Sequence, residues 1–248
     1  MESAPVTLTS VSLSYFTEKE ETPAIRDLNM QVKKGEFVAI VGPSGCGKTS
    51  VLSLIMGLMQ PQEGVVDIDR QKIRIGYMLQ RDHLLEWRTV EKNVLLGLEV
   101  QHRKTKETVE KASQLLKEYG LWDFARYYPN QLSGGMRQKV ALIRTLATEP
   151  ELLLLDEPFS ALDYQTRLTL CDEVYRIIRN EKKTAILVTH DISEAVSMAD
   201  RILVFSKRPS RVKAEIENDF SPDMPPLVRR RQPSFQRRFE QIWEELEP

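Results

Sequence analysis

The sequence predicts an α/β fold: a mostly parallel sheet covered by helices, preceded by half-buried strands and interrupted by a helical insertion. Three observations lead to this prediction. Short apolar runs, such as residues 37–41 and 152–155, alternate with stretches of helical spacing, an arrangement typical of parallel sheets. Residues 6–13 alternate between apolar and polar side chains, which indicates a half-buried strand. The stretch 89–147 carries apolar residues at helical spacing.

The elements expected before residue 82 are mostly strands. Val6, Leu8, Val11 and Leu13 form the apolar side of the first strand. The run at 37–41 is continuously apolar and ends in a glycine-rich loop. In order, we expect a strand at 6–13, a charged turn at 18–23, a strand at 24–32, a strand at 37–41, a helix at 48–59 that Pro61 and Gly64 stop, and strands at 65–68 and 73–79.

After residue 82 helices come first, and the alternation of strands and helices then resumes. Gly120, Pro129-Asn130 and Glu149-Pro150 separate the helical segments. In order, we expect helices at 89–100, 104–119 and 134–147, a strand at 152–155, a helix at 164–180, a strand at 184–189, a helix at 192–198 and a strand at 201–205.

The last part of the chain, residues 207–248, is rich in proline and is expected to be mostly loop. One amphipathic helix is expected at 234–246, because apolar residues recur there at helical spacing. The arginines at 229–231 and 237–238 have two interpretations: a solvated basic face beside acidic residues, or a contact with anionic lipid headgroups. The apolar residues of the helix are Phe235, Phe239, Ile242 and Leu246.

Composition excludes several classes of protein. The 248 residues are 41% hydrophobic and 29% charged, as in ordinary globular proteins, so wholesale disorder is not expected. Lys and Arg number 35 against 36 Asp and Glu, so the net charge of −1 indicates no general electrostatic hold on nucleic acid or anionic lipid. The two cysteines, Cys46 and Cys171, indicate a reduced compartment rather than a disulfide scaffold.

No membrane-targeting or membrane-spanning segment is expected from the sequence. Residues 1–10 lack the basic and apolar regions of a signal peptide. Nowhere does the chain hold the roughly 18 or more apolar residues that a spanning helix needs. A role at a membrane would therefore depend on a partner protein.

The first chemical motif is a glycine-rich loop between an apolar strand and a helix. It fits the pattern G-x-x-x-x-G-K-[ST], in which backbone N–H groups and the helix N-terminus surround a phosphate. Lys48 supplies a positive charge for the β- and γ-phosphates, and the Thr49 hydroxyl is a natural Mg²⁺ ligand. The alternative is a glycine turn without a ligand. Cys46 is either a tolerated small residue or a redox-sensitive thiol. The residues of this phosphate loop are Gly42, Pro43, Ser44, Gly45, Cys46, Gly47, Lys48 and Thr49.

Two carboxylates follow the buried strand at 152–155. Ligands of open α/β sheets bind at the carboxyl ends of the strands, which is where Asp156 and Glu157 lie. Asp156 is suited to hold Mg²⁺ through water, and Glu157 to orient or deprotonate an attacking water. A solvated acidic turn is the alternative, and the accompanying phosphate loop argues against it.

A second anion site is predicted where the helix at 134–147 begins. Ser133 is a plausible N-cap, and Gly134 and Gly135 leave the backbone N–H groups open. One chain with two phosphate-type sites suggests a head-to-tail dimer, in which a nucleotide lies between the loop of one subunit and the Ser133 helix of the other. An ordinary capped helix is the alternative for this segment alone.

These motifs, in this order, resemble those of the ATP-binding cassette (ABC) ATPase subunits of transporters across nearly the whole chain. Ser160 stands where many members of that family have glycine. The resemblance implies a P-loop NTPase core with an N-terminal antiparallel β portion and an inserted helical subdomain. It divides the chain into core 1–81, helical subdomain 82–150, core 151–206 and C-terminal extension 207–248. The matching segments are the phosphate loop, Gln80, Leu132-Ser133-Gly134-Gly135-Met136-Arg137-Gln138, Leu155-Asp156-Glu157-Pro158, Ser160-Ala161-Leu162-Asp163 and Val188-Thr189-His190-Asp191.

The resemblance also implies a role for each site residue. Glu157 resembles the catalytic base, and His190 the histidine that contacts the γ-phosphate, although a hydrogen-bonded histidine at a strand end is the alternative. Tyr15, with Phe16 as the second choice, resembles the aromatic residue that stacks on adenine. The implied metal ligands are Thr49, Gln80 and Asp156. The implied ATP-binding residues are Tyr15, the phosphate loop, Ser50, Gln80 and, from the opposite subunit, Ser133, Gly134, Gly135 and Asp163.

Within the family, several segments resemble the ATPases of nitrate, sulfonate and taurine importers, a group that also includes importers of vitamin precursors. These segments are 84–90 with Asn93, 157–163, 189–195, 203–212 and the tail at 239–246. Leu84, Leu85 and Trp87 are candidates for contact with a permease, or alternatively pack inside the helical insertion.

The resemblance implies an ATPase that uses ATP and Mg²⁺ and works as a head-to-tail homodimer. Its implied partners are transmembrane permease subunits and, indirectly, a solute-binding protein, but no nucleic acid. The implied location is the cytoplasmic face of the cell membrane, as a peripheral subunit. Two alternatives remain: a soluble ABC ATPase not tied to transport, acting on DNA or ribosomes, and a P-loop kinase or other nucleotide-binding module.

Overall fold

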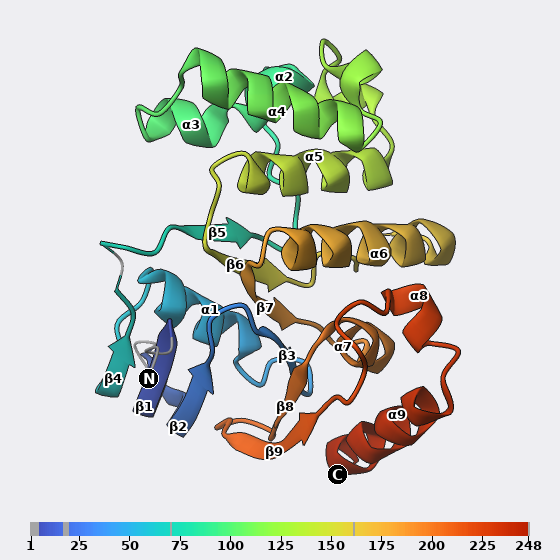
Figure 1. The fold of residues 1–248 in the computed structure, drawn as a ribbon. Coiled ribbons are helices and arrows are strands. Elements are labelled where there is room, and N and C mark those ends of the chain that lie inside the picture. Colours follow the sequence, from blue (N-terminus) through green and yellow to red (C-terminus); the bar gives the residue numbers. More distant parts are fainter. Residues whose placement is uncertain (1–4, 17–19, 70, 161, 248) are drawn as a thin grey trace.

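The molecule is built around two sheets, with a group of helices set apart above the larger one (Figure 1). The computed structural model describes residues 5–16, 20–69, 71–160 and 162–247. The expectations for residues 1–4 and 17–19 and for Ala161 lie outside the described residues. No described helix is both long enough and apolar enough to cross a membrane.

The larger sheet has six strands in the order β5-β6-β7-β3-β8-β9. All neighbours pair in parallel except β8 and β9, which are antiparallel at one edge. The predicted mostly parallel sheet is therefore confirmed, while the edge strand β9 lies in a region expected to be loop. The strands are β3 (Phe37–Val41), β5 (Ile75–Met78), β6 (Leu152–Asp156), β7 (Thr184–Val188), β8 (Arg201–Phe205) and β9 (Val212–Glu217).

The central strands are apolar throughout because both faces of the sheet are covered. Alternate side chains of β3 enter two different hydrophobic clusters: Phe37, Ala39 and Val41 pack toward one face, and Val38 and Ile40 toward the other. The first cluster includes side chains of the helical insertion, and the second includes those of the N-terminal strands. Continuous burial explains why these strands show no period of two.

The smaller sheet is antiparallel, with strand order β2-β1-β4. Its strands are β1 (Val6–Phe16), β2 (Glu21–Val32) and β4 (Glu63–Asp67). The predicted turn at 18–23 is wrong in its second half, because residues 21–23 already pair with β1. Gly64 has a φ of 80°, and a Cβ there would lie 2.3 Å from the Ser10 carbonyl oxygen, so this close approach of β4 to β1 requires glycine.

Most helices lie where the spacing predicts them. In the core these are α1 (Lys48–Met56), α6 (Tyr164–Asn180) and α7 (Ile192–Met198). The prediction that α1 extends to residue 59 is wrong, because Gly57 ends the helix in a left-handed conformation. The helical insertion holds α2 (Val90–Val94), α3 (Leu96–Val100), α4 (Lys106–Glu118) and α5 (Gly134–Leu146), with short 3₁₀ turns at Trp122–Phe124 and Pro129–Gln131.

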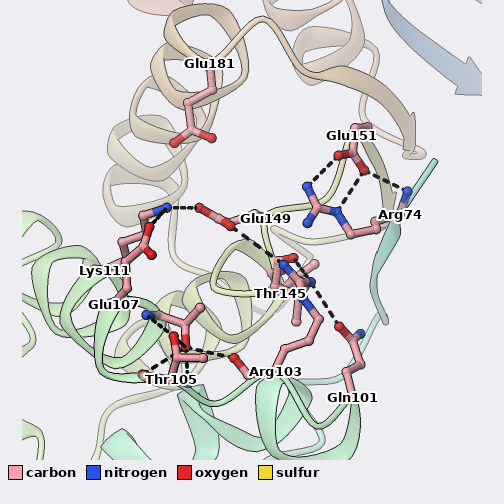
Figure 2. A network of polar contacts seen from close by, with 12 residues as sticks. Arg74, Gln101, Arg103, Thr105, Glu107, Lys111, Thr145, Glu149, Glu151 and Glu181 are labelled. Carbon is pink, nitrogen blue, oxygen red and sulfur yellow. Dashed lines mark hydrogen bonds and ion pairs between the residues drawn. The ribbon is translucent and has the colours of Figure 1, made fainter. Parts of the chain in front are cut away.

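Charged residues connect the helical insertion to the larger sheet at the turn that follows α5 (Figure 2). Lys111 of α4 donates to Glu149 at 2.7 Å, and Arg103 donates to the Thr148 carbonyl oxygen at 3.0 Å. Just beyond, Glu151 accepts two hydrogen bonds from the Arg74 guanidinium. These contacts join the turn after α5 to both the insertion and the start of β5.

The C-terminal part contains more regular structure than expected. Besides β9, it forms α8 (Pro226–Arg229) and α9 (Pro233–Leu246), of which only α9 is predicted. The amphipathic pattern of α9 is confirmed, since Ile242 is fully buried and Phe235, Phe239 and Leu246 pack against the same cluster. Both interpretations of the arginines are wrong for Arg229, which is fully buried beneath the tail instead of facing solvent or lipid.

Candidate functional site

The phosphate loop joins β3 to α1, as predicted, and its shape depends on glycine. Gly45 and Gly47 have φ values of 74° and 114°, a region that residues with a Cβ rarely enter. A Cβ on Gly42 would lie 3.0 Å from both Cys46 Sγ and Phe205 Cβ. The loop is therefore a tight turn whose backbone is free to approach a ligand closely.

Lys48 is buried at the first position of α1 and points back into the loop. Its Nζ donates to the carbonyl oxygens of Gly42 at 2.7 Å and Pro43 at 3.0 Å. The ammonium group is thus held at the mouth of the loop by two neutral backbone acceptors. A cation held this way suits an anionic ligand at the N-terminus of α1.

Thr49 and Asp156 form a pair of oxygen donors beside the loop. Thr49 Oγ1 donates to Asp156 Oδ1 at 3.2 Å, and the Tyr77 hydroxyl donates to Asp156 Oδ2 at 3.3 Å. Burial raises the pKa of the Asp156 carboxyl above its ordinary value, and burial next to Asp156 raises the pKa of Tyr77 to about 12. Hard oxygen ligands of this kind fit a Mg²⁺ ion.

Glu157 is the point where three distant segments meet. Gln80 Nε2 donates to Glu157 Oε2 at 3.1 Å, and His190 Nδ1 lies 3.2 Å from the same oxygen. Glu157 has a φ of 46°, a conformation that is strained for a residue other than glycine and is common at functional sites. The His190 side chain stays 57% exposed, so one edge of this group faces solvent.

Tyr15 and Ser50 lie together at the end of β1, next to α1. The Tyr15 hydroxyl is 2.8 Å from Ser50 Oγ and donates to the sulfur of Met59 at 3.7 Å. Tyr15 is 39% exposed and Phe16 67% exposed. The hydroxyl end of Tyr15 is therefore anchored, and the stacking role of either ring stays a prediction.

The second predicted anion site forms a separate group. Ser133 caps α5, with its Oγ accepting from the Met136 N–H at 3.3 Å, and Asp163 caps α6 by accepting from the Thr166 N–H at 3.0 Å. Ser133, Gly134, Gly135 and Asp163 line one pocket of about 450 Å³. Among the described residues, no hydrogen bond joins this group to the phosphate loop.

Of the residues predicted to contact a permease, one is buried and another is exposed. Leu84 is buried, which supports core packing, whereas Trp87 is 74% exposed. Asn93 is fully buried and donates to three backbone carbonyls, including that of Leu85, which holds the 85–89 segment in place. Burial raises the pKa of the Cys46 thiol, which favours a tolerated small residue over a reactive one.

Three polar residues of the site were missed from the sequence: Tyr77, Arg167 and Glu194. Glu194 is 3% exposed and accepts from Thr189 Oγ1 at 2.6 Å, and Arg167 lies between this carboxylate and Asp191. Arg167 and Glu194 each occupy the first turn of a helix that follows a predicted site loop. That position in the first turn is the one sequence signal that indicates Arg167 and Glu194.

Comparison with known proteins agrees with this arrangement. Residues 25–160 match the family model described as ABC transporter. An uncharacterized ABC transporter ATP-binding protein of Bacillus subtilis is 49% identical over 95% of this chain and 93% of its own. An aliphatic sulfonates import ATP-binding protein of Bacillus anthracis is 37% identical over 87% of each chain. A nitrate import ATP-binding protein of a Synechocystis species is 38% identical over 84% of this chain and 80% of its own.

A solved structure extends the likeness to the fold. It is a dimeric ATP-binding cassette in a post-hydrolysis state with ADP and Pi, 34% identical, with a TM-score of 0.77 over 87% of this chain and all of that chain. The predicted resemblance is confirmed, and a P-loop kinase is no longer a competing interpretation. The chain therefore belongs to the ABC transporter family, as one of its ATP-binding, ATP-hydrolysing cassettes.

Proposed function

We propose that the protein is the ATPase subunit of a bacterial ABC importer, which couples ATP hydrolysis between two head-to-tail copies to solute uptake by a permease. The observation that carries the chemical part is the convergence of Gln80 and His190 on Glu157, beside the Thr49–Asp156 pair. An acidic turn without a function would not be expected to bring a glutamine and a histidine from distant segments to one carboxylate oxygen.

The phosphates of ATP would lie in the phosphate loop, with Lys48 exchanging its two carbonyl acceptors for phosphate oxygens. Thr49, Asp156 and Gln80 would hold Mg²⁺, which neutralises phosphate charge when bound. Ser50 follows in α1, and Tyr15, which touches it, is the proposed aromatic partner of adenine. Each of these residues would bind ATP or Mg²⁺, or orient one of them.

Glu157 is the proposed catalytic base. In hydrolysis, a water oxygen attacks the γ-phosphorus, the water proton passes to the Glu157 carboxylate, and the bond to the β-phosphate oxygen breaks to leave ADP. Gln80 holds the carboxylate from one side. His190, whose side chain is more than half exposed, is free to contact the γ-phosphate from the other.

The Ser133 group would complete the site of the opposite copy. Ser133, Gly134 and Gly135 present the N-terminus of a 13-residue helix, and Asp163 shares their pocket. The dimeric state of the solved relative supports this arrangement. Each chain then contributes to two reaction centres and holds neither one complete.

The import role rests on the relatives, whose names include aliphatic sulfonates import and nitrate import. We propose a solute of the nitrate, sulfonate, taurine or vitamin-precursor class, brought by a solute-binding protein to the permease. Trp87 is the proposed permease contact. Its side chain is exposed on the helical insertion, and it lies close to Gln80 in the sequence. The subunit would then lie peripherally on the cytoplasmic face of the membrane.

The decisive experiment replaces the base by its neutral isostere. Glu157→Gln is expected to bind ATP with unchanged affinity but to lose hydrolysis by roughly 100-fold or more, because the amide cannot accept the water proton. Glu107→Gln, on an exposed side chain of α4, is the matched control and is expected to keep full activity. Wild-type hydrolysis in Glu157→Gln would refute the proposed chemistry.

The transport part is tested separately. Deletion of the gene is expected to abolish uptake of one solute of the proposed class, and tagged protein is expected to purify from membranes with a permease. Purification with ribosomes or DNA and no membrane protein would instead identify an ABC ATPase that is not tied to transport.

A further inference from the structure

Arg167 occupies a junction between two loops of the proposed site. It lies in the first turn of α6, directly after the segment that ends with Asp163. Its Nη2 donates to the Leu162 carbonyl oxygen at 3.1 Å, and its Nη1 donates to Asp191 Oδ2 at 3.3 Å. One guanidinium therefore contacts both the loop before α6 and Asp191, the residue that caps α7.

The segment around His190, on the other side of this junction, is held by several hydrogen bonds. Thr189 is 1% exposed, and its Oγ1 donates to Glu194 Oε2 at 2.6 Å while accepting from the Asp191 N–H at 3.0 Å. Asp191 in turn caps α7, with Oδ1 accepting from the Ser193 N–H at 2.7 Å. The residues on both sides of His190 are therefore held in place by hydrogen bonds. The His190 imidazole itself points toward Glu157.

The Arg167 guanidinium also faces a second carboxylate. Its Nε lies 3.8 Å from Glu194 Oε1 and is buried without a hydrogen-bond partner of its own. The cation therefore lies between Asp191 and Glu194, the two acidic groups that position Thr189 and the start of α7. Its planar fork is what allows one side chain to reach the Leu162 carbonyl and Asp191 together.

We propose that Arg167 is a positioning residue that couples the Asp163 segment to His190, so that contact with the partner copy adjusts the reach of His190 toward Glu157. The inference rests on the proposed function, in which Asp163 faces the partner and His190 the γ-phosphate. Arg167 itself touches no reacting atom. It acts on the rate of hydrolysis through the backbone on either side of His190.

The test substitutes Arg167 by Met and measures binding, turnover and the histidine signals of the full-length chain. Arg167→Met is expected to keep the affinity for ATP, since no described contact links Arg167 to the phosphate loop, and to lower kcat by roughly 10- to 100-fold, as small displacements of catalytic groups do. Arg176→Met, on an exposed side chain of the same helix, is the control and is expected to keep wild-type kcat.

The imidazole NMR signals provide a readout that a general loss of stability does not move. The chain has 3 histidines, so His190 is assigned from the signal lost in His190→Ala. In Arg167→Met the His190 signals are expected to shift, while those of His83 and His102 stay in place. Unchanged His190 signals, or an ATP affinity that falls as much as kcat, would overturn the proposal.

Arg167→Lys covers the case in which the Met variant does not fold. Lysine keeps a positive charge near Asp191 but lacks the fork that also reaches the Leu162 carbonyl. A selective shift of His190 with unchanged ATP affinity supports the coupling, and wild-type signals overturn it. Because this readout needs no hydrolysis, it is independent of the result for Glu157→Gln, which tests the proposed chemistry.

Discussion

Arg229 anchors the C-terminal tail, and its replacement by methionine should loosen that tail. The side chain is 0% exposed and has no ion-pair partner among the described residues. It donates to the carbonyl oxygens of Met224 at 2.8 Å, Ser221 at 3.0 Å and Ser197 at 3.3 Å, and to the Tyr175 hydroxyl. Burial lowers the pKa of the guanidinium below its ordinary value, as expected for a desolvated cation.

The magnitude follows from these contacts. Methionine fills much of the same volume but removes all four donated hydrogen bonds. The Ser221 carbonyl oxygen still accepts from the Met224 N–H, and the Tyr175 hydroxyl still donates to the Pro222 carbonyl oxygen. The carbonyl oxygens of Met224 and Ser197 lose their donor, at a cost of about 1–3 kcal/mol each. Relief of the desolvation of the cation offsets part of this loss, which leaves about 1–4 kcal/mol. For a chain of this size, about 2–4 °C per kcal/mol predicts a fall in Tm of roughly 2–16 °C.

The assay is thermal denaturation of Arg229→Met beside Arg231→Met, whose side chain lies at an exposed position of the same segment. Limited proteolysis followed by mass spectrometry locates the change. Cleavage is expected within residues 206–232 in Arg229→Met only. Equal Tm values for the two variants, or unchanged protection of the tail, would show that the buried guanidinium does not hold the tail in place.

Two further predictions concern the site. Burial raises the pKa of Glu194 from 4.5 to about 7, so its neutral form stabilises the fold below pH 4.5 and this contribution is lost as the pH rises through 7. The shift corresponds to roughly 3 kcal/mol, and the Tm of Glu194→Gln minus that of the wild type is therefore expected to increase between pH 5 and 8; a difference independent of pH would contradict the shift. Gly42→Ala places a Cβ 3.0 Å from Cys46 Sγ and Phe205 Cβ, an overpacking of about 1–3 kcal/mol. Titration with a fluorescent ATP analogue is expected to show an affinity lower by roughly tenfold, and wild-type affinity would mean that the loop accommodates the extra methyl group.

The helices and strands predicted most accurately are those with a local signal at each end. α6 and α7 begin where predicted because Asp163 and Asp191 cap them, which is a property of neighbouring residues. α1 ends before the position that Pro61 predicts, because Gly57 adopts a left-handed conformation and caps the helix. The prediction of loop at β9 is wrong although Val212, Ala214 and Ile216 alternate with charged residues there, because the prolines of residues 207–248 favour loop and outweigh a pattern of six residues.

The sequence alone determined the phosphate loop, the buried strands and the order of the site motifs, because each depends on residues adjacent along the chain. Three features follow from the packing of segments that lie far apart in the chain: Gln80 and His190 meet on one oxygen of Glu157, Arg167 joins two loops, and Arg229 is buried. No local pattern specifies them, because hydrogen bonds and burial between distant segments depend on how the layers pack. A residue's type shows which contacts it can make, and the fold decides which of them it makes.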